Sequence, residues 1–151
     1  MRVLYTTLII LIAQFTLFAQ NAAITFRDIS AESGISVSHI STAENRYIIE
    51  SMSGGTAVFD CDGDGYLDVA TVKGSSVENF KKGGDLFVTL YGQIDGARTK
   101  IPKFENITSS ANLTRKGWGM GVTAVDFDGN GILDLFITGF AGNAVYRGKG
   151  Q

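Results

Sequence analysis

The sequence predicts an all-β protein that contains two copies of one unit. Residues 55–69 align without gaps on residues 121–135, so the chain carries an internal duplication. In both copies, runs of small and β-branched residues flank a loop rich in Asp and Gly, which is typical of strands joined by a tight turn. The chain has 19 glycines and one proline, and after residue 20 no stretch of about 12 residues shows helical spacing.

A second pair of similar segments lies upstream of the first. Phe26–Ile35 resembles Phe104–Leu113, and the first unit is longer because it contains extra chain between Ile35 and Gly54. The units are expected to cover about residues 24–91 and 102–151, the second being truncated, with about four strands each. The predicted strands are Thr56–Phe59 and Val122–Val125 before the loops, Leu67–Val72 and Leu133–Thr138 after them, and Asp85–Leu90 and Tyr47–Glu50 elsewhere.

The acidic charge of the chain is concentrated in the two loops. The net charge is −2, yet seven of the ten Asp residues lie within residues 60–68 and 126–134. The remainder of the chain is basic, because it carries 13 Lys and Arg residues against 8 Asp and Glu residues. This distribution indicates two cation sites and predicts no nucleic-acid partner.

The spacing of the oxygen-bearing residues in the loops favours calcium. Ca²⁺ takes ~6–8 oxygen ligands, and alternating acidic residues separated by glycines can supply most of them from one short loop. The sequence therefore predicts two Ca²⁺ sites. The expected ligands are Asp60, Asp62, Asp64, the carbonyl of Tyr66 and Asp68 in the first loop, and Asp126, Asp128, Asn130, the carbonyl of Ile132 and Asp134 in the second.

The two sites are not expected to be equal. Asn130 stands where the first loop has Asp64, which removes one ligand charge, so we expect the second site to bind more weakly unless loop rigidity reverses the order. An EF-hand is disfavoured, because loop position 12 is Thr71 or Ile137 rather than a carboxylate. The remaining alternative is that both loops are plain polar turns.

The first 19 residues are typical of a secretory signal peptide. Arg2 precedes a mostly apolar run from Val3 to Phe18, and Ala19 is the candidate for the last residue before the cleavage site. The alternative is an uncleaved N-terminal anchor. In either case the remaining chain is expected to be exported, as a secreted, extracellular or cell-envelope protein, and after cleavage no membrane span is expected. Cys61 is the only cysteine, so no internal disulfide forms.

These residues resemble the FG-GAP/VCBS repeats of integrin-like β-propellers, in which a D-x-[DN]-x-[DN]-G-x-x-D loop joins two strands of a blade and binds calcium. A narrower resemblance is to the cartilage acidic protein / ASPIC–UnbV family. It rests on Phe26–Ile35, Tyr47–Gly55 and the first loop, then on Gly117–Gly121 and Asn143–Arg147 around the second loop. Residues 92–103 depart from that pattern, because they lack an asparagine- and glycine-rich turn.

The resemblance implies an incomplete β-propeller of two blades. We expect the sequence to be the N-terminal part of a longer protein, since two blades cannot close a ring and leave unpaired edges. If complete, it must self-associate or pair with another chain. The implied function is a secreted, calcium-binding structural or interaction module with an extracellular protein or glycan partner. The alternative is a non-catalytic part of a larger extracellular enzyme with active residues beyond residue 151.

Other conspicuous residues are predicted to be structural, and the chain is not expected to be an enzyme. His39 is the only histidine and no nucleophile motif accompanies it, so a packing or surface role is expected. Cys61 is expected to pack in an apolar position rather than to be reactive. Trp118 lies between glycines and is expected to pack between blades, with stacking on a ligand such as a sugar as the alternative.

Overall fold

The fold is described from a computed structural model, which covers residues 23–44, 47–52, 54–94, 96 and 99–150. The predicted signal segment lies outside these residues. In the part of the chain that is described, regular structure is mostly β-strand, and each helix has at most five residues. Within the same residues, no helix is long and apolar enough to cross a bilayer.

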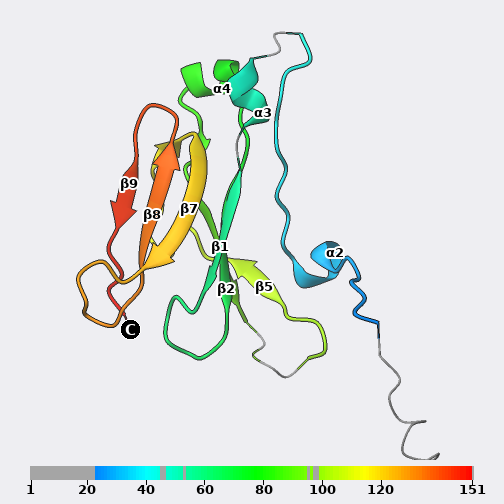
Figure 1. Ribbon diagram of the computed structural model, residues 1–151, viewed down its shortest axis with the longest axis vertical. Helices are drawn as coiled ribbons and strands as arrows, with labels where there is room; N and C mark the ends of the chain where they lie inside the picture. Colours follow the sequence, from blue (N-terminus) through cyan, green and yellow to red (C-terminus); the bar gives the residue numbers. More distant parts are fainter. Residues whose placement is uncertain (1–22, 45–46, 53, 95, 97–98, 151) are drawn as a thin grey trace, which may run out of the picture.

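Two antiparallel sheets form the body of the protein, and they lie against each other (Figure 1). The first sheet has the order β1-β2-β4-β5 and the second has the order β7-β8-β9. This arrangement confirms the predicted all-β, incomplete propeller-like fold. The strands are β1 (Gly55–Phe59), β2 (Asp68–Val72), β3 (Asp85–Leu86), β4 (Thr89–Gln93), β5 (Phe104–Asn106), β6 (Lys116–Gly117), β7 (Gly119–Val125), β8 (Asp134–Gly139) and β9 (Ala144–Tyr146), with β3 and β6 in a small ladder of their own.

The first three strands of both sheets follow the same register. Phe59 pairs with Asp68 where β1 meets β2, and Val125 pairs with Asp134 where β7 meets β8. On the other side of the hairpin, Val69 faces Tyr91 of β4, and the equivalent Leu135 faces Tyr146 of β9. The duplication seen in the sequence is therefore a duplication of sheet geometry, and β9 is the counterpart of β4.

The fourth strand of the first sheet belongs in sequence to the second unit. In β5, which opens that unit, Asn106 pairs with Tyr91 and Phe104 pairs with Gln93. The opening segment of one unit therefore completes the sheet of the unit before it.

The hydrophobic core lies between the two sheets, where β1 and β2 face β7. The backbones approach closely there, because a Cβ atom added to Gly55 would lie 3.1 Å from the Cα atom of Gly121, its own repeat counterpart. A side chain at Gly55 would therefore press against the backbone of the second sheet. The buried core residues are Phe59, Ala70, Val72, Phe87, Val88, Leu90, Leu113, Leu135 and Ile137.

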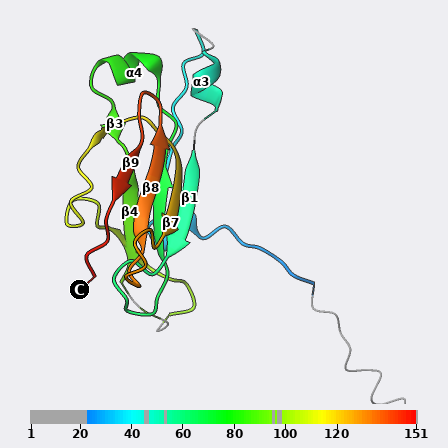
Figure 2. The ribbon, with the colours of Figure 1, turned by 60° about the vertical axis from the view of Figure 1, so that its left-hand side comes forward.

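Trp118 and His39 take the packing roles expected for them. Trp118 is buried beside Phe80 of α4 (Val77–Lys81) and Phe140, with ring centroids 6.4 and 5.5 Å away. The Nδ1 atom of His39 accepts a hydrogen bond of 2.7 Å from the Gly74 amide. This bond holds the segment that follows α2 (Ser30–Ser33) alongside the first sheet (Figure 2).

The predicted strand Tyr47–Glu50 is wrong, because residues Ile48–Ser51 form the helical turn α3. The reason is a tertiary one. The carboxylate of Glu50 is buried and accepts hydrogen bonds of 2.7 Å from the Thr42 amide and 2.9 Å from the Val77 amide. These long-range bonds override the β-branched local pattern. Asp85–Leu90 is also interrupted, since β3 ends at Leu86 and β4 begins at Thr89.

Glu50 leads to a prediction about stability and pH. The hydrogen bonds donated by the amides of Thr42 and then Val77 lower the pKa of Glu50. The unfolded chain therefore takes up this proton first, at about pH 4.3, so the stabilisation from Glu50 is complete near neutral pH and is lost as the pH falls. We expect Glu50→Gln to lower the free energy of unfolding at neutral pH and to flatten its decline towards acid, as measured by urea denaturation. Glu105→Gln, at an exposed site on β5, is the control, and equal pH slopes in all three proteins would contradict the prediction.

Candidate metal centres in the two acidic loops

The two acidic loops project from the same end of the two sheets (Figure 1). The first joins β1 to β2 and the second joins β7 to β8, so equivalent hairpins position them. At loop positions 4 and 6 the backbone has positive φ values of 72–88°, which glycine adopts without strain. These positions are Gly63 and Gly65 in the first loop and Gly129 and Gly131 in the second.

The aspartate at position 1 organises the first loop. Its Oδ1 atom accepts hydrogen bonds from the amides of Gly63 at 2.8 Å and Asp64 at 3.2 Å. Its Oδ2 atom accepts a third bond from the Gly65 amide at 2.9 Å. Asp60 therefore holds the loop wrapped around its own carboxylate.

The second loop repeats this pattern bond for bond. Asp126 accepts hydrogen bonds from the amides of Gly129 at 2.8 Å, Asn130 at 3.1 Å and Gly131 at 2.8 Å. In both loops these amides stabilise the ionised carboxylate. The Gly65 amide is the largest cause that lowers the pKa of Asp60, and the Gly131 amide has the same effect on the pKa of Asp126.

The aspartate at position 9 closes each loop and is almost fully buried. Asp68 is 4% exposed, and its Oδ2 atom accepts a hydrogen bond of 2.8 Å from the Cys61 amide. Its Oδ1 atom accepts one of 2.9 Å from the Gln93 amide at the end of β4. Asp68 thus ties the start of its loop to the third strand of the sheet.

Asp134 makes the same two connections in the second sheet. It is 3% exposed and accepts hydrogen bonds from the amides of Phe127 at 3.1 Å and Gly148, just after β9, at 2.8 Å. Among the residues that the structure describes, neither Asp68 nor Asp134 forms an ion pair with Lys or Arg. A buried carboxylate without a cationic partner is costly unless it coordinates a metal ion.

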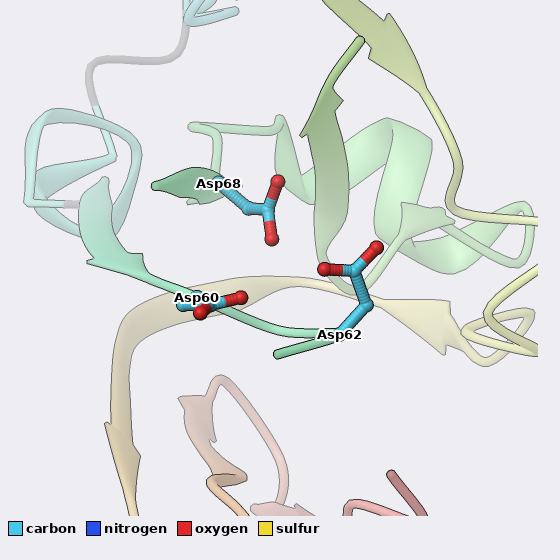
Figure 3. Close-up of side chains that lie close together, drawn as sticks. All are labelled: Asp60, Asp62 and Asp68. Atoms are coloured by element: carbon cyan, nitrogen blue, oxygen red, sulfur yellow. The ribbon is translucent and has the colours of Figure 1, made fainter. Parts of the chain in front are cut away.

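Each loop brings three carboxylates together. One oxygen from each of Asp60, Asp62 and Asp68 lies within 4.8 Å of the others, and the carboxylates point towards one another (Figure 3). In the second loop, Asp126, Asp128 and Asp134 form the equivalent cluster. Carboxylate oxygens clustered in this way fit a hard divalent cation such as Ca²⁺.

The other predicted ligands lie beside these clusters. Asp64 accepts a hydrogen bond of 2.8 Å from the Tyr66 amide, and Asn130 accepts one of 2.7 Å from the Ile132 amide. These bonds place the side chain at position 5 and the backbone of position 7 in the same relation in both loops. Coordination by Asp64, Asn130 and the carbonyl groups of Tyr66 and Ile132 stays a prediction.

One residue of the second loop's environment was missed in the sequence. The guanidinium group of Arg147 lies 2.5 Å from an Oδ2 oxygen of Asp128 and forms an ion pair with it. The equivalent position in the first sheet is Gly92, which carries no charge. Arg147 lies outside the loop in sequence, and the pairing of β9 with β8 brings it to Asp128.

Cys61 behaves as the sequence predicts. Its side chain packs against the core, and burial raises its pKa to about 12, with further increases from the neighbouring aspartates. The thiol is therefore protonated and unreactive near neutral pH. Its counterpart Phe127 is different, since it is mostly exposed and contacts the ring of Phe136.

The hydrogen bonds of the first loop yield a matched pair of variants. In Asp60→Asn, an NH₂ group replaces one of two oxygens that both accept amide hydrogen bonds, so we expect a lower melting temperature in EDTA. In Asp62→Asn the hydrogen bond from the Asp64 amide, of 3.2 Å, can be kept through the remaining oxygen. That variant is therefore expected to melt close to the wild type. Equal melting temperatures for the two variants would show that Asp60 does not organise the loop.

Comparison with known protein families identifies a repeat that includes both acidic loops. Residues 60–137, about half of the chain, match the FG-GAP-like repeat. The matched region begins at the first aspartate of the first loop and ends in β8, just after the second loop. Neither the curated proteins nor the solved structures contain a match. The chain therefore belongs to the family of FG-GAP-like repeat proteins.

Proposed function

We propose that both acidic loops bind Ca²⁺ and that the chain is an exported, propeller-like interaction module. The observation that carries the calcium proposal is the buried aspartate at position 9, Asp68 or Asp134, which lies in a cluster of three carboxylates and itself forms no ion pair with Lys or Arg among the described residues. The FG-GAP-like repeat supports a non-catalytic, structural role for the module.

The donor set favours Ca²⁺ over the common transition metals. The candidate side-chain ligands are oxygen donors, whereas Zn²⁺ sites use mainly sulfur and nitrogen. The one thiol near the first loop, Cys61, is protonated near neutral pH, and the one histidine hydrogen-bonds to Gly74 instead. Mg²⁺ requires nearly ideal octahedral geometry and keeps several water ligands, so a glycine-rich loop suits Ca²⁺ better.

A bound ion would stabilise more than the loop. Asp68 joins the start of the first loop to Gln93 of β4, and Asp134 joins the second loop to Gly148. A cation held by each cluster would offset the repulsion among its three carboxylates and the cost of burying the aspartate at position 9, and would so stabilise the arrangement that connects each loop to the far side of its sheet. Calcium binding and folding are coupled in such an arrangement. The outer surfaces of the sheets would then remain free for an extracellular protein or glycan partner.

Two features support a weaker second site. Asn130 supplies one charge fewer than Asp64, as the sequence indicates. In addition, Arg147 is paired with Asp128, so a cation entering the second loop competes with a guanidinium group. The first loop has no such competitor among the described residues, because Gly92 occupies the equivalent position.

The calcium proposal is tested by calorimetric titration of the chelated protein with CaCl₂. We expect two binding events, of which Asp60→Ala removes the tighter and Asp126→Ala the weaker. Exchanging position 5 provides the matched test: Asn130→Asp should tighten the second site, and Asp64→Asn should weaken the first, each by roughly tenfold, or about 1.4 kcal/mol. Absence of calcium heat from a folded protein would refute the proposal.

Export is tested separately, by producing the chain in a secreting host and determining the N-terminus of the product. We expect a mature protein that begins near residue 20, because Arg2, the apolar run and Ala19 form a signal pattern. An exported product that keeps residues 1–19 would indicate the anchor instead. Retention in the cytoplasm would contradict export. The closer relation to the ASPIC–UnbV family likewise stays a prediction.

A further inference from the structure

Asn130 differs from the other asparagines of the chain in the residue that follows it. It is the one asparagine in the sequence that precedes a glycine, Gly131. Both residues are exposed in the second acidic loop, and Gly131 has a φ of 85°. Because glycine has no side chain, the Gly131 nitrogen is not shielded from the side chain of Asn130. The amide group of Asn130 is therefore open to attack by the main chain of its own loop.

The reaction that this pair of residues permits is deamidation. The main-chain nitrogen of Gly131 attacks the side-chain carbonyl carbon of Asn130, and the new C–N bond closes an imide ring. The bond from that carbon to the NH₂ group breaks, and this group leaves as ammonia with the proton from the Gly131 nitrogen. Water then opens the ring, so the net change is the replacement of an amide by a carboxyl group. The attack is intramolecular, and water is the only other reactant.

One hydrogen bond in the loop favours this attack. The Ile132 amide donates a hydrogen bond of 2.7 Å to the Oδ1 atom of Asn130. Negative charge develops on this oxygen when the carbon that bears it is attacked. A donor that is already in place stabilises such a charge.

An aspartate already occupies the same position of the first loop, in the same geometry. The Oδ1 atom of Asp64 accepts a hydrogen bond of 2.8 Å from the Tyr66 amide, and the amide of Gly65 donates one of 2.9 Å to Asp60. The second loop makes the equivalent bonds at its own positions 5, 6 and 7. An aspartate at position 130 therefore fits the loop that is already present.

We propose that Asn130 is a self-modification site, where deamidation to aspartate gives the second loop the same carboxylate ligands as the first. This inference rests on the proposed calcium sites, because its consequence is a change in calcium affinity. The conversion adds one negative charge at position 5, and ligand charge is one determinant of affinity. The second site therefore approaches the affinity of the first after the protein has been made.

Opening of the ring also has a second product, with the opposite effect. When water attacks the main-chain carbonyl of the ring, the chain continues through the former side chain and isoaspartate forms. The main chain then gains one carbon atom between positions 5 and 6. This displaces the Gly131 amide from the carboxylate of Asp126, to which it donates at 2.8 Å. We expect isoaspartate to abolish the second site.

Bound calcium is expected to slow the reaction. The side-chain oxygen of Asn130 is a candidate ligand, and attack requires the carbon beside it to turn towards the Gly131 nitrogen. An ion that holds the oxygen limits this rotation. Loss of calcium thus opens the site to modification, and the aspartate product then binds calcium more tightly.

The site is tested by incubating the purified protein in CaCl₂ or in EDTA and mapping its peptides by mass spectrometry. Asn143 is the internal control, because it is also exposed but precedes alanine. Both asparagines lie in one tryptic peptide, between Lys116 and Arg147, so fragment ions compare them in the same molecules. We expect Asn130 to deamidate several times faster than Asn143, and faster in EDTA than in CaCl₂.

Two variants provide matched controls. Asn130→Gln keeps an amide oxygen but should resist the reaction, because its longer side chain would have to close a larger ring. Asp64→Asn creates the same pair of residues in the first loop, before Gly65, and should revert in part to the wild type as it ages. The aspartate form of the aged protein, separated by ion exchange, should bind calcium at the second site roughly tenfold more tightly, as Asn130→Asp does.

Several outcomes would overturn the inference. These are deamidation of Asn130 no faster than that of Asn143, an Asp64→Asn variant that stays unchanged, and an aspartate form that binds calcium no more tightly than the fresh protein. Equal rates in CaCl₂ and EDTA would overturn it too when the first loop still gives calcium heat. Absence of calcium heat from both loops would instead overturn the proposed function.

Discussion

Each sheet depends on the hydrogen bonds that the buried aspartate at loop position 9 accepts. Asp68 and Asp134 each accept one amide hydrogen bond from the start of their own loop and one from the end of the third strand or just beyond it. Their negative charge is therefore held where water is largely excluded, beside two further carboxylates. This placement is unfavourable for an isolated anion but suits a cation site.

The two repeat units are more alike in backbone geometry than in the side chains around their loops. Both loops have the same amide bonds around Asp60 and Asp126, and both hairpins have the same register. The differences lie in the side chains around them. Arg147 contacts the second cluster where the first sheet has Gly92, and Cys61 packs inward where Phe127 remains exposed. The two proposed sites would therefore differ in affinity for a cation because of residues that lie outside the ligand pattern.

The sequence was sufficient to predict the all-β class, the repeat and the positions of the hairpins, because alternation of β-branched residues and glycine-rich turns are local signals. It was insufficient for Tyr47–Glu50, whose helical turn is imposed by contacts from Thr42 and Val77. It also did not reveal that Asp68 and Asp134 reach the third strand. The distance in sequence from hairpin to third strand differs between the units, 25 residues to Gln93 and 14 to Gly148. Because these separations differ, the repeat pattern alone does not show which amide each aspartate reaches.

The position of β5 has a consequence for how the protein is made. A chain emerging from its N-terminus presents β1, β2 and β4 first, and their sheet stays open until Phe104–Asn106 follows. The first unit therefore cannot finish folding from its own residues, so synthesis and folding are staggered by one segment. During that interval, the exposed edge at the growing end is the part of the nascent chain most open to wrong pairing and to chaperones. Domain boundaries drawn between the two sequence repeats would cut through a finished sheet, and a unit expressed to such a boundary would lack its last strand.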